Sequence, residues 1–146
     1  MSRPFIDTNI LVRFIAGDHP QLQTATAALL ETIERGELEV QCPSTVIADA
    51  VYVLSSKANH DLERQEVSDT LSAIVRLPKL VIEDRAQVLG ALVIFAQTSL
   101  DFGDAMILAG MHLQGKTILY SYDHDFDRFR DIQRLEPSPE GLAQAA

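Results

Sequence analysis

The sequence is poor in cysteine, in basic residues and in long apolar runs. Cys42 is the single cysteine among 146 residues, which excludes an internal disulfide and a cysteine-rich zinc site. Twelve Lys and Arg stand against 21 Asp and Glu, for a net charge of −9. This balance argues against a broad basic surface for nucleic acid or anionic lipid. It does not exclude an enzyme that acts on nucleic acid, because acids around a metal also lower the formal charge.

The densest apolar run covers residues 89–96, far short of the roughly 20 residues that cross a bilayer. We therefore expect no membrane span. Asp7 and Arg13 interrupt the N-terminal apolar stretch, so we expect no export signal. The single cysteine favours a cytoplasmic location. The length predicts one domain. We place it at residues 1–135 and expect residues 136–146, which contain Pro137 and Pro139, to form a loosely held tail.

Apolar residues recur at helical spacing in several segments. They predict helices directly after Asp7, over 21–34, from Pro43 and Ser44 onward, and over 62–76, 85–98 and 102–113. Short apolar runs predict the end of a buried strand at 4–6 and a buried strand at 117–120, and an alternating run predicts a strand at 38–42. The run 80–82 separates two helices. This alternation predicts an α/β sandwich around a mainly parallel sheet. In such sheets ligands bind at the carboxyl ends of the strands.

Two acids directly follow predicted strands. Asp7 follows Phe5 and Ile6, and Asp123 follows the strand at 117–120. A helix N-cap is an equally good interpretation of Asp7, since Asp is a favoured cap. The acidic run 123–127 suggests an EF-hand, but Arg128 and Arg134 stand where the loop needs Gly and a bidentate Glu.

Two further acids share helix faces with apolar residues. Asp49 lies within 60° of Val46 and Val53 around the predicted helix, so we expect a carboxylate that needs a partner if it is buried. A partly exposed helix edge is the alternative.

Asp104 lies on the same face as Leu108 and Met111. A local explanation is also open, in which Asp101 caps the helix and Asp104 occupies its first turn. That explains an acid near the helix end but not the apolar face.

Two acids at strand ends and two on helix faces near the expected carboxyl edge of the sheet would repel one another unless they share a cation. Ligands that are all oxygen favour Mg²⁺ or Mn²⁺ over zinc. Phosphoryl transfer is the natural chemistry of such a site.

Four segments together resemble the motifs of PIN-domain ribonucleases. Residues 5–11 (FIDTNIL) resemble the opening motif, 44–54 the second, 101–105 (DFGDA) the third, and 121–123 with 125–126 the fourth. The resemblance covers the chain from Phe5 to about Leu135 and implies a PIN-like α/β/α sandwich. Length and helix count most resemble the VapC-type toxins of type II toxin–antitoxin systems.

The resemblance implies that Asp7, Asp49, Asp104 and Asp123 are the catalytic acids and hold the metal. Asn9 and Ser121 would be supporting polar groups, and Asp101 would help to orient the cluster. Two positions depart from the family pattern. Asp49 stands where Glu is usual, and Ser121 stands where Thr is more common.

The activity implied is Mg²⁺-dependent hydrolysis of an RNA phosphodiester that leaves a 5′-phosphate, with Mn²⁺ as a substitute cation. The implied partners are RNA, with transfer RNA the recurrent target in the family, and a small antitoxin that covers the acids. The helix at 85–98 is apolar over more than one face, which fits either a buried core helix or the homodimer interface typical of these toxins.

Two other classes of function are open. The first is a PIN-like binding or regulatory module with little nuclease activity, which Asp49 in place of Glu and the acidic composition favour. The second is a phosphatase of the haloacid-dehalogenase type, which needs a second Asp where this sequence has Asn9. A receiver domain lacks a suitable Lys at the last strand.

Overall fold

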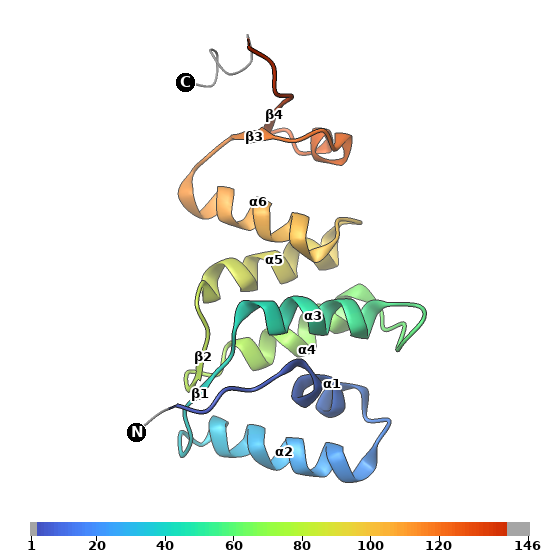
Figure 1. The fold of residues 1–146 in the computed structure, drawn as a ribbon, viewed down its shortest axis with the longest axis vertical. Helices are drawn as coiled ribbons and strands as arrows, with labels where there is room; N and C mark the ends of the chain where they lie inside the picture. Colours follow the sequence, from blue (N-terminus) through green and yellow to red (C-terminus); the bar gives the residue numbers. More distant parts are fainter. Residues whose placement is uncertain (1–2, 140–146) are drawn as a thin grey trace. The chain divides into compact units, whose positions relative to one another are not determined.

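The structure is a computed structural model that describes residues 3–139 (Figure 1). The chain divides into two compact units, with the boundary between Ala109 and Gly110. None of the helices within the described residues is both long and apolar enough to span a membrane.

The first unit is rich in helices, whose bounds agree closely with the prediction. They are α1 (Thr8–Ala16), α2 (Pro20–Glu34), α3 (Ser44–Ser55), α4 (Arg64–Val75), α5 (Arg85–Gln97) and the beginning of α6 (Phe102–Gln114). Local signals explain where several of them begin and end. Asp7 caps α1, α2 has Pro20 at its first position, and Gly17 ends α1 with a φ of 65° that favours glycine.

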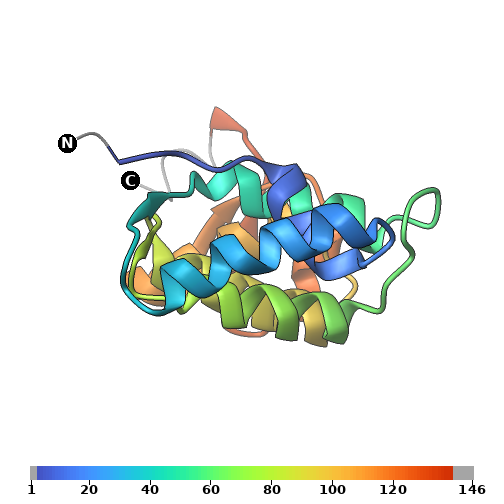
Figure 2. The same ribbon diagram turned by 90° about the horizontal axis from the view of Figure 1, so that it is seen from below.

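Two short parallel strands lie side by side at one end of the first unit (Figures 1 and 2). In β1 (Val40–Gln41) and β2 (Leu80–Val81), Val40 pairs with Leu80 and Gln41 with Val81. Phe5 adds an isolated parallel bridge to Gln41. The predicted strand at 38–42 is therefore present but shorter. The run 80–82, expected only to separate helices, supplies its partner.

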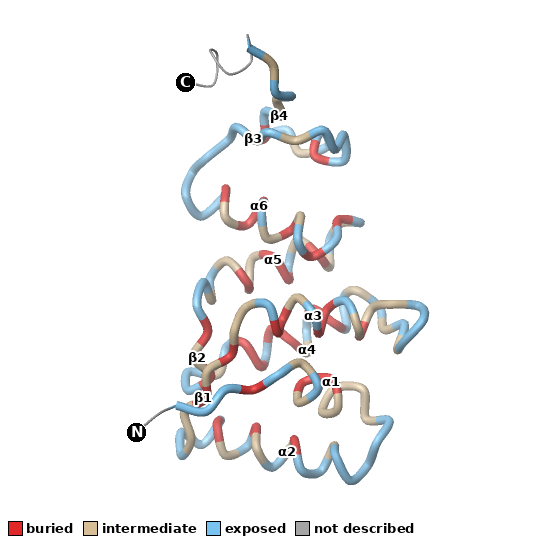
Figure 3. Tube along the Cα trace, viewed as in Figure 1, coloured by how far each residue is buried: buried red, intermediate tan, exposed pale blue. Residues whose placement is uncertain are grey.

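The core of the first unit forms where the apolar faces of its helices meet, and Figure 3 shows buried residues along α3, α4 and α5. Side chains such as Ile47, Leu54, Leu71 and Leu92 are fully buried. Each contributes about 1.5–3 kcal/mol by leaving water. In α5, Val88, Ala91, Leu92 and Phe95 are buried, whereas Val93 is 46% exposed. This helix is therefore not buried on all sides.

The second unit contains β3 (Ile118–Tyr120), the 3-10 helix η1 (His124–Arg128) and β4 (Gln133–Leu135). β3 pairs with β4 in parallel. The prediction that residues 117–120 form a buried strand is wrong in its burial, because Ile118 and Tyr120 are 45% and 40% exposed. Within the described part of this unit, a sheet of two short strands provides no second layer to cover them.

The predicted α/β class with parallel strands is confirmed. The strands fall into two sheets of two strands each. The domain boundary at residue 135 stays a prediction. Of the predicted tail, residues 140–146 lie outside the described part of the chain.

Candidate functional site

Asp7 ends an extended segment that pairs with β1. The Ile6 amide donates to the Gln41 carbonyl at 3.1 Å, and the Gln41 amide donates to the Pro4 carbonyl at 2.7 Å. Asp7 Oδ1 then accepts the Asn9 amide at 3.2 Å, which makes Asp7 the N-cap of α1. The cap interpretation is therefore confirmed. Because the residue is also exposed, one helix end both orients the carboxylate and leaves it accessible to a ligand.

Asp49 lies in the second turn of α3, which begins almost directly after β1. The Cys42 amide donates to the Val81 carbonyl at 2.8 Å and continues the sheet up to that helix. Asp49 is exposed, although Val46 is buried and Val53 partly buried. The alternative of an exposed helix edge is therefore correct, and no partner is needed to offset the cost of burying this carboxylate.

Asp104 occupies the first turn of α6 and is partly buried. Its amide donates to Asp101 Oδ1 at 2.8 Å, and the Ala105 amide donates to the Asp101 carbonyl at 3.0 Å. Asp101 therefore caps α6, as the local interpretation expected. Leu108 is fully buried and Met111 is 9% exposed, so Asp104 does begin an otherwise apolar helix face.

Arg64 holds the turn before α6, a role that nothing in the sequence pattern indicated. It donates from Nε to the Phe95 carbonyl at 2.8 Å and from Nη2 to the Leu100 carbonyl. Its guanidinium lies 3.6 Å from the centroid of the Phe95 ring, a cation–π contact. Phe95 in turn meets Phe102 edge-on at 6.5 Å. These contacts fix the end of α5 and the beginning of α6.

In the first unit, the segment 4–6 and β1 run in the same direction. Asp7, which follows the first, and α3, which follows the second, therefore lie at the same edge of the sheet. This is the carboxyl edge, where ligands bind in parallel sheets. A cavity of about 430 Å³ opens there. It is lined by Phe5, Gln41, Pro43, Ser44, Thr45 and Glu83.

Asp123 in the second unit repeats the local geometry of Asp7. It follows β3 and caps η1, and its Oδ1 accepts the Asp125 amide at 2.9 Å. Ser121 Oγ accepts the Asp123 amide at 3.0 Å. Ser121 therefore holds the backbone of Asp123 in place, which is a supporting contact that a hydroxyl can make.

Arg134 on β4 braces the turn that carries Asp123. It donates from Nη1 to the Ser121 carbonyl at 2.9 Å and from Nε to Asp127 Oδ1 at 2.8 Å. His124 Nδ1 lies 3.1 Å from Asp127 Oδ2. Hydrogen bonds from Arg134 and His124 hold the pKa of Asp127 below its usual range. The sequence pattern did not indicate this network, because the residues of β4 show no apolar alternation.

The donor chemistry fits a hard divalent cation, since each of the four acids offers carboxylate oxygens. Within the described residues, neither unit alone gathers three or more His, Cys, Asp or Glu side chains that could hold a metal ion. Asp7, Asp49 and Asp104 belong to the first unit and Asp123 to the second.

Comparison with known proteins identifies a family. The model of the PIN domain matches residues 5–132, which include the segments of all four acids. No curated protein matches the sequence significantly. PIN domains are generally metal-dependent nucleases and typically use divalent metals. The match spans most of the chain, and the chain therefore belongs to the PIN domain family.

Proposed function

We propose that the chain is a Mg²⁺-dependent endoribonuclease and the toxin of a toxin–antitoxin pair. One observation carries the proposal: the family match spans residues 5–132 and contains an acid in each of four motif segments. The positions of Asp7 and Asp123 support it. Asp123 follows the parallel strand β3, and Asp7 follows the isolated parallel bridge at Phe5, which is all that forms of the strand predicted at 4–6. Each acid caps the next helix and remains exposed.

In this proposal Asp7, Asp49, Asp104 and Asp123 hold Mg²⁺, with Mn²⁺ as a substitute. When bound, a divalent cation polarises a phosphate and lowers the pKa of water. The chain's own residues prepare the acids for that task. The cap at Asp7 fixes one carboxylate, and the capping of α6 by Asp101 fixes the turn that carries Asp104.

Two of the supporting residues each hold a different one of the four acids in position. Ser121 holds the backbone of Asp123, and the amide of Asn9 orients the carboxylate of Asp7. Asp49 is one methylene shorter than the Glu usual in the family. Its contact with a cation would therefore pass through water more readily than that of a Glu.

The proposed partners are an RNA substrate of the transfer-RNA class, a cognate antitoxin, and a second copy of the chain in a cytoplasmic homodimer. Exposed carboxylates at Asp7, Asp49 and Asp123 favour an antitoxin that covers the acids with a basic side chain. The apolar composition of α5 and its incomplete burial favour a contact between copies.

Cleavage of total and transfer RNA by the purified protein tests this function. We expect cuts that need Mg²⁺ or Mn²⁺, stop in EDTA and leave 5′-phosphates. Asp7→Asn and Asp104→Asn should slow cleavage by roughly a hundredfold or more. Asn also caps helices, so Asp7→Asn removes the charge and retains the cap.

Asp61→Asn is the matched control. Asp61 is exposed and has a φ of 50°, a conformation that Asn tolerates. This variant should cleave as fast as the unchanged protein. Equal activity of the wild type and Asp7→Asn would contradict the proposal and favour a PIN domain that binds rather than cleaves.

A further inference from the structure

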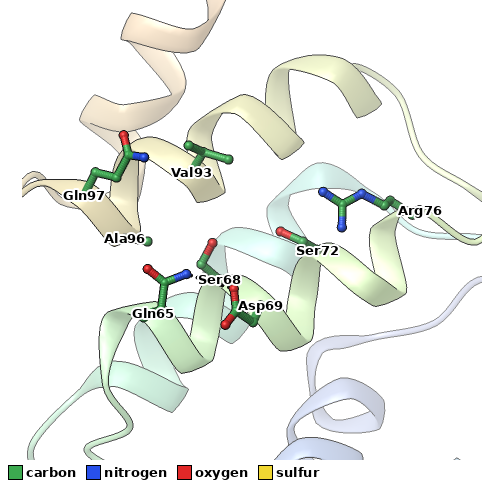
Figure 4. A pocket seen from close by; sticks show the side chains of 8 residues that line it. All are labelled: Gln65, Ser68, Asp69, Ser72, Arg76, Val93, Ala96 and Gln97. Atoms are coloured by element: carbon green, nitrogen blue, oxygen red, sulfur yellow. Dashed lines mark hydrogen bonds between the residues drawn. The ribbon is translucent and has the colours of Figure 1, made fainter.

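A polar groove lies between α4 and α5 in the first unit (Figure 4). Its volume is about 460 Å³, within the range of pockets that hold small ligands. Residues of these two helices line it, and none of the four proposed metal-binding acids is among them. The groove is thus a second feature of the molecule with its own chemistry.

Two serines of α4 direct hydroxyl groups into this groove (Figure 4). Ser68 and Ser72 are only 4% and 5% exposed. Within the described residues, neither side chain has a hydrogen-bond partner, and no fully buried side-chain nitrogen or oxygen lacks one. The two hydroxyl oxygens therefore face the open space of the groove.

Several other serine and threonine hydroxyls at helical positions behave differently. They donate to the carbonyl four residues earlier, which is the usual hydrogen bond of such a side chain in a helix. These residues are Thr24, Thr32, Ser55, Thr70 and Thr98. Thr70 does so from α4 itself. Among residues 3–139, Thr8, Ser44 and Thr45 also form no side-chain hydrogen bond, but they lie in the first turns of α1 and α3. Ser68 and Ser72 differ from them because they lie beyond the first turn of α4 and are almost fully buried.

Arg76 provides a positive charge at one end of the groove. Residues 68, 72 and 76 are spaced by four, which places them along one face of α4. Figure 4 shows the guanidinium of Arg76 extending toward Ser72. No acid among residues 3–139 forms an ion pair with it, unlike Arg134, which contacts Asp127 and Glu136.

The other end of the groove carries amide and carboxylate groups. Gln65 donates from Nε2 to Asp69 Oδ1 at 2.8 Å, and Gln97 faces them from α5. Asp69 and Arg76 are separated by about 10 Å along the helix. The lining contains no aromatic ring, so the groove offers no surface on which a base could stack.

We propose that this groove binds a sugar-phosphate unit. The phosphate would lie against Arg76 and the Ser72 hydroxyl, with charge-assisted hydrogen bonds. The sugar hydroxyls would contact Ser68 and the amides of Gln65 and Gln97. The unit has two sources, a free nucleotide or one residue of an RNA strand. This inference does not depend on the proposed nuclease activity.

NMR titration of the full chain in EDTA tests the proposal, since no metal-dependent cleavage occurs there. The probes are ribose 5-phosphate, adenosine 5′-monophosphate, inorganic phosphate, adenosine and an RNA tetranucleotide. We expect ribose 5-phosphate to shift the amide signals of residues 65–76 and 93–97 and to bind more tightly than inorganic phosphate. Tighter binding of the tetranucleotide would assign the groove to RNA, and tighter binding of the mononucleotide to a free nucleotide.

Variants locate the binding. Ser72→Ala and Arg76→Gln should each weaken binding of ribose 5-phosphate about tenfold or more, the value of a hydrogen bond to a charged group. Thr70→Ala, which removes a hydroxyl already bonded within α4, and Arg35→Gln, which removes an exposed charge, should leave it unchanged. The proposal is overturned if residues 65–76 do not shift at millimolar ribose 5-phosphate. It is also overturned if adenosine binds equally well, or if the two groove variants bind like the controls.

Discussion

The turns at Asp7 and Asp123 have the same local geometry and are supported in different ways. In both, an acid ends a parallel-paired segment and accepts the amide two residues later, at 3.2 Å from Asn9 and 2.9 Å from Asp125. Behind Asp7, α1 rests on the buried side chains of Leu11 and Val12. Behind Asp123, Arg134 holds the turn through the Ser121 carbonyl and Asp127.

The difference shows that the same arrangement, an acid that ends a paired segment and caps the next helix, can be held in place by two kinds of force. In the first unit, the burial of apolar side chains provides the stabilisation, and this force has no preferred direction and does not depend on protonation. The hydrogen-bonded ion pairs of the second unit depend on protonation and salt. The two units should therefore respond differently to core truncation, to pH and to removal of single arginines.

The largest effect should come from the core of the first unit. Leu92→Ala removes a fully buried side chain of α5 and should lower the free energy of unfolding by about 2–5 kcal/mol. Urea unfolding followed by circular dichroism measures this. A loss below about 1 kcal/mol would mean that the core does not support this unit as described.

Arg64→Met should destabilise the turn between α5 and α6. Methionine keeps an apolar stem but loses both carbonyl contacts and the cation–π contact, at a cost of about 2 kcal/mol. Hydrogen exchange at residues 98–104 should quicken. Arg35→Met, which removes an exposed pair with Glu37, should cost under about 1 kcal/mol. Equal effects of the two variants would refute the role of Arg64.

Acid should weaken the second unit. The pKa of Asp127 is lowered in the folded state by Arg134 and His124. The stabilisation is therefore present above the ordinary aspartate pKa of about 4 and is lost as pH falls through the lower folded value. The protection of the amides of residues 121–127 against hydrogen exchange, relative to the rate of an unstructured chain at the same pH, should fall on acidification. In Asp127→Asn this part of the pH dependence should disappear, and its persistence would contradict the role of the network.

The smallest effect should be a loss of stability at alkaline pH that is confined to the first unit. Burial raises the pKa of the Cys42 thiol to about 11. The unfolded thiol ionises near pH 8.5, so stability should fall only as pH rises from there toward the folded pKa. Iodoacetamide at pH 8 should label native Cys42 far more slowly than the urea-unfolded chain. Similar labelling rates would show that the thiol is accessible.

Helices could be predicted from the sequence better than strands. Long segments with apolar spacing and clear end signals, such as Pro43 before α3, place helices within a few residues. β4 (Gln133–Leu135) was missed because its polar residues show no alternation. β3 was found, but its apolar residues predicted a burial that the described second unit does not provide.

Part of the candidate site also followed from the sequence. The cap at Asp7 and the capping of α6 by Asp101 are local, so nearby residues suffice to predict them. The solvent exposure of Asp49 could not be predicted in this way. Helical angles show which side of α3 carries the residue, but they do not show where the packed core ends and the surface begins. Arg64 contacts carbonyls 31 and 36 positions away in the chain, and Arg134 contacts residues 7 and 13 positions away across an irregular segment. Neither set of contacts has a periodic pattern that one sequence could reveal.

The most direct test of the central claim is whether the four acids share one cation. We would titrate the labelled protein with Mn²⁺ and follow the paramagnetic broadening of its amide signals. We predict that the signals beside Asp7, Asp49, Asp104 and Asp123 broaden together with one affinity, and that Asp7→Asn weakens the broadening at all four. Broadening at one acid alone, or an Asp7→Asn variant that leaves the other three unchanged, would contradict it.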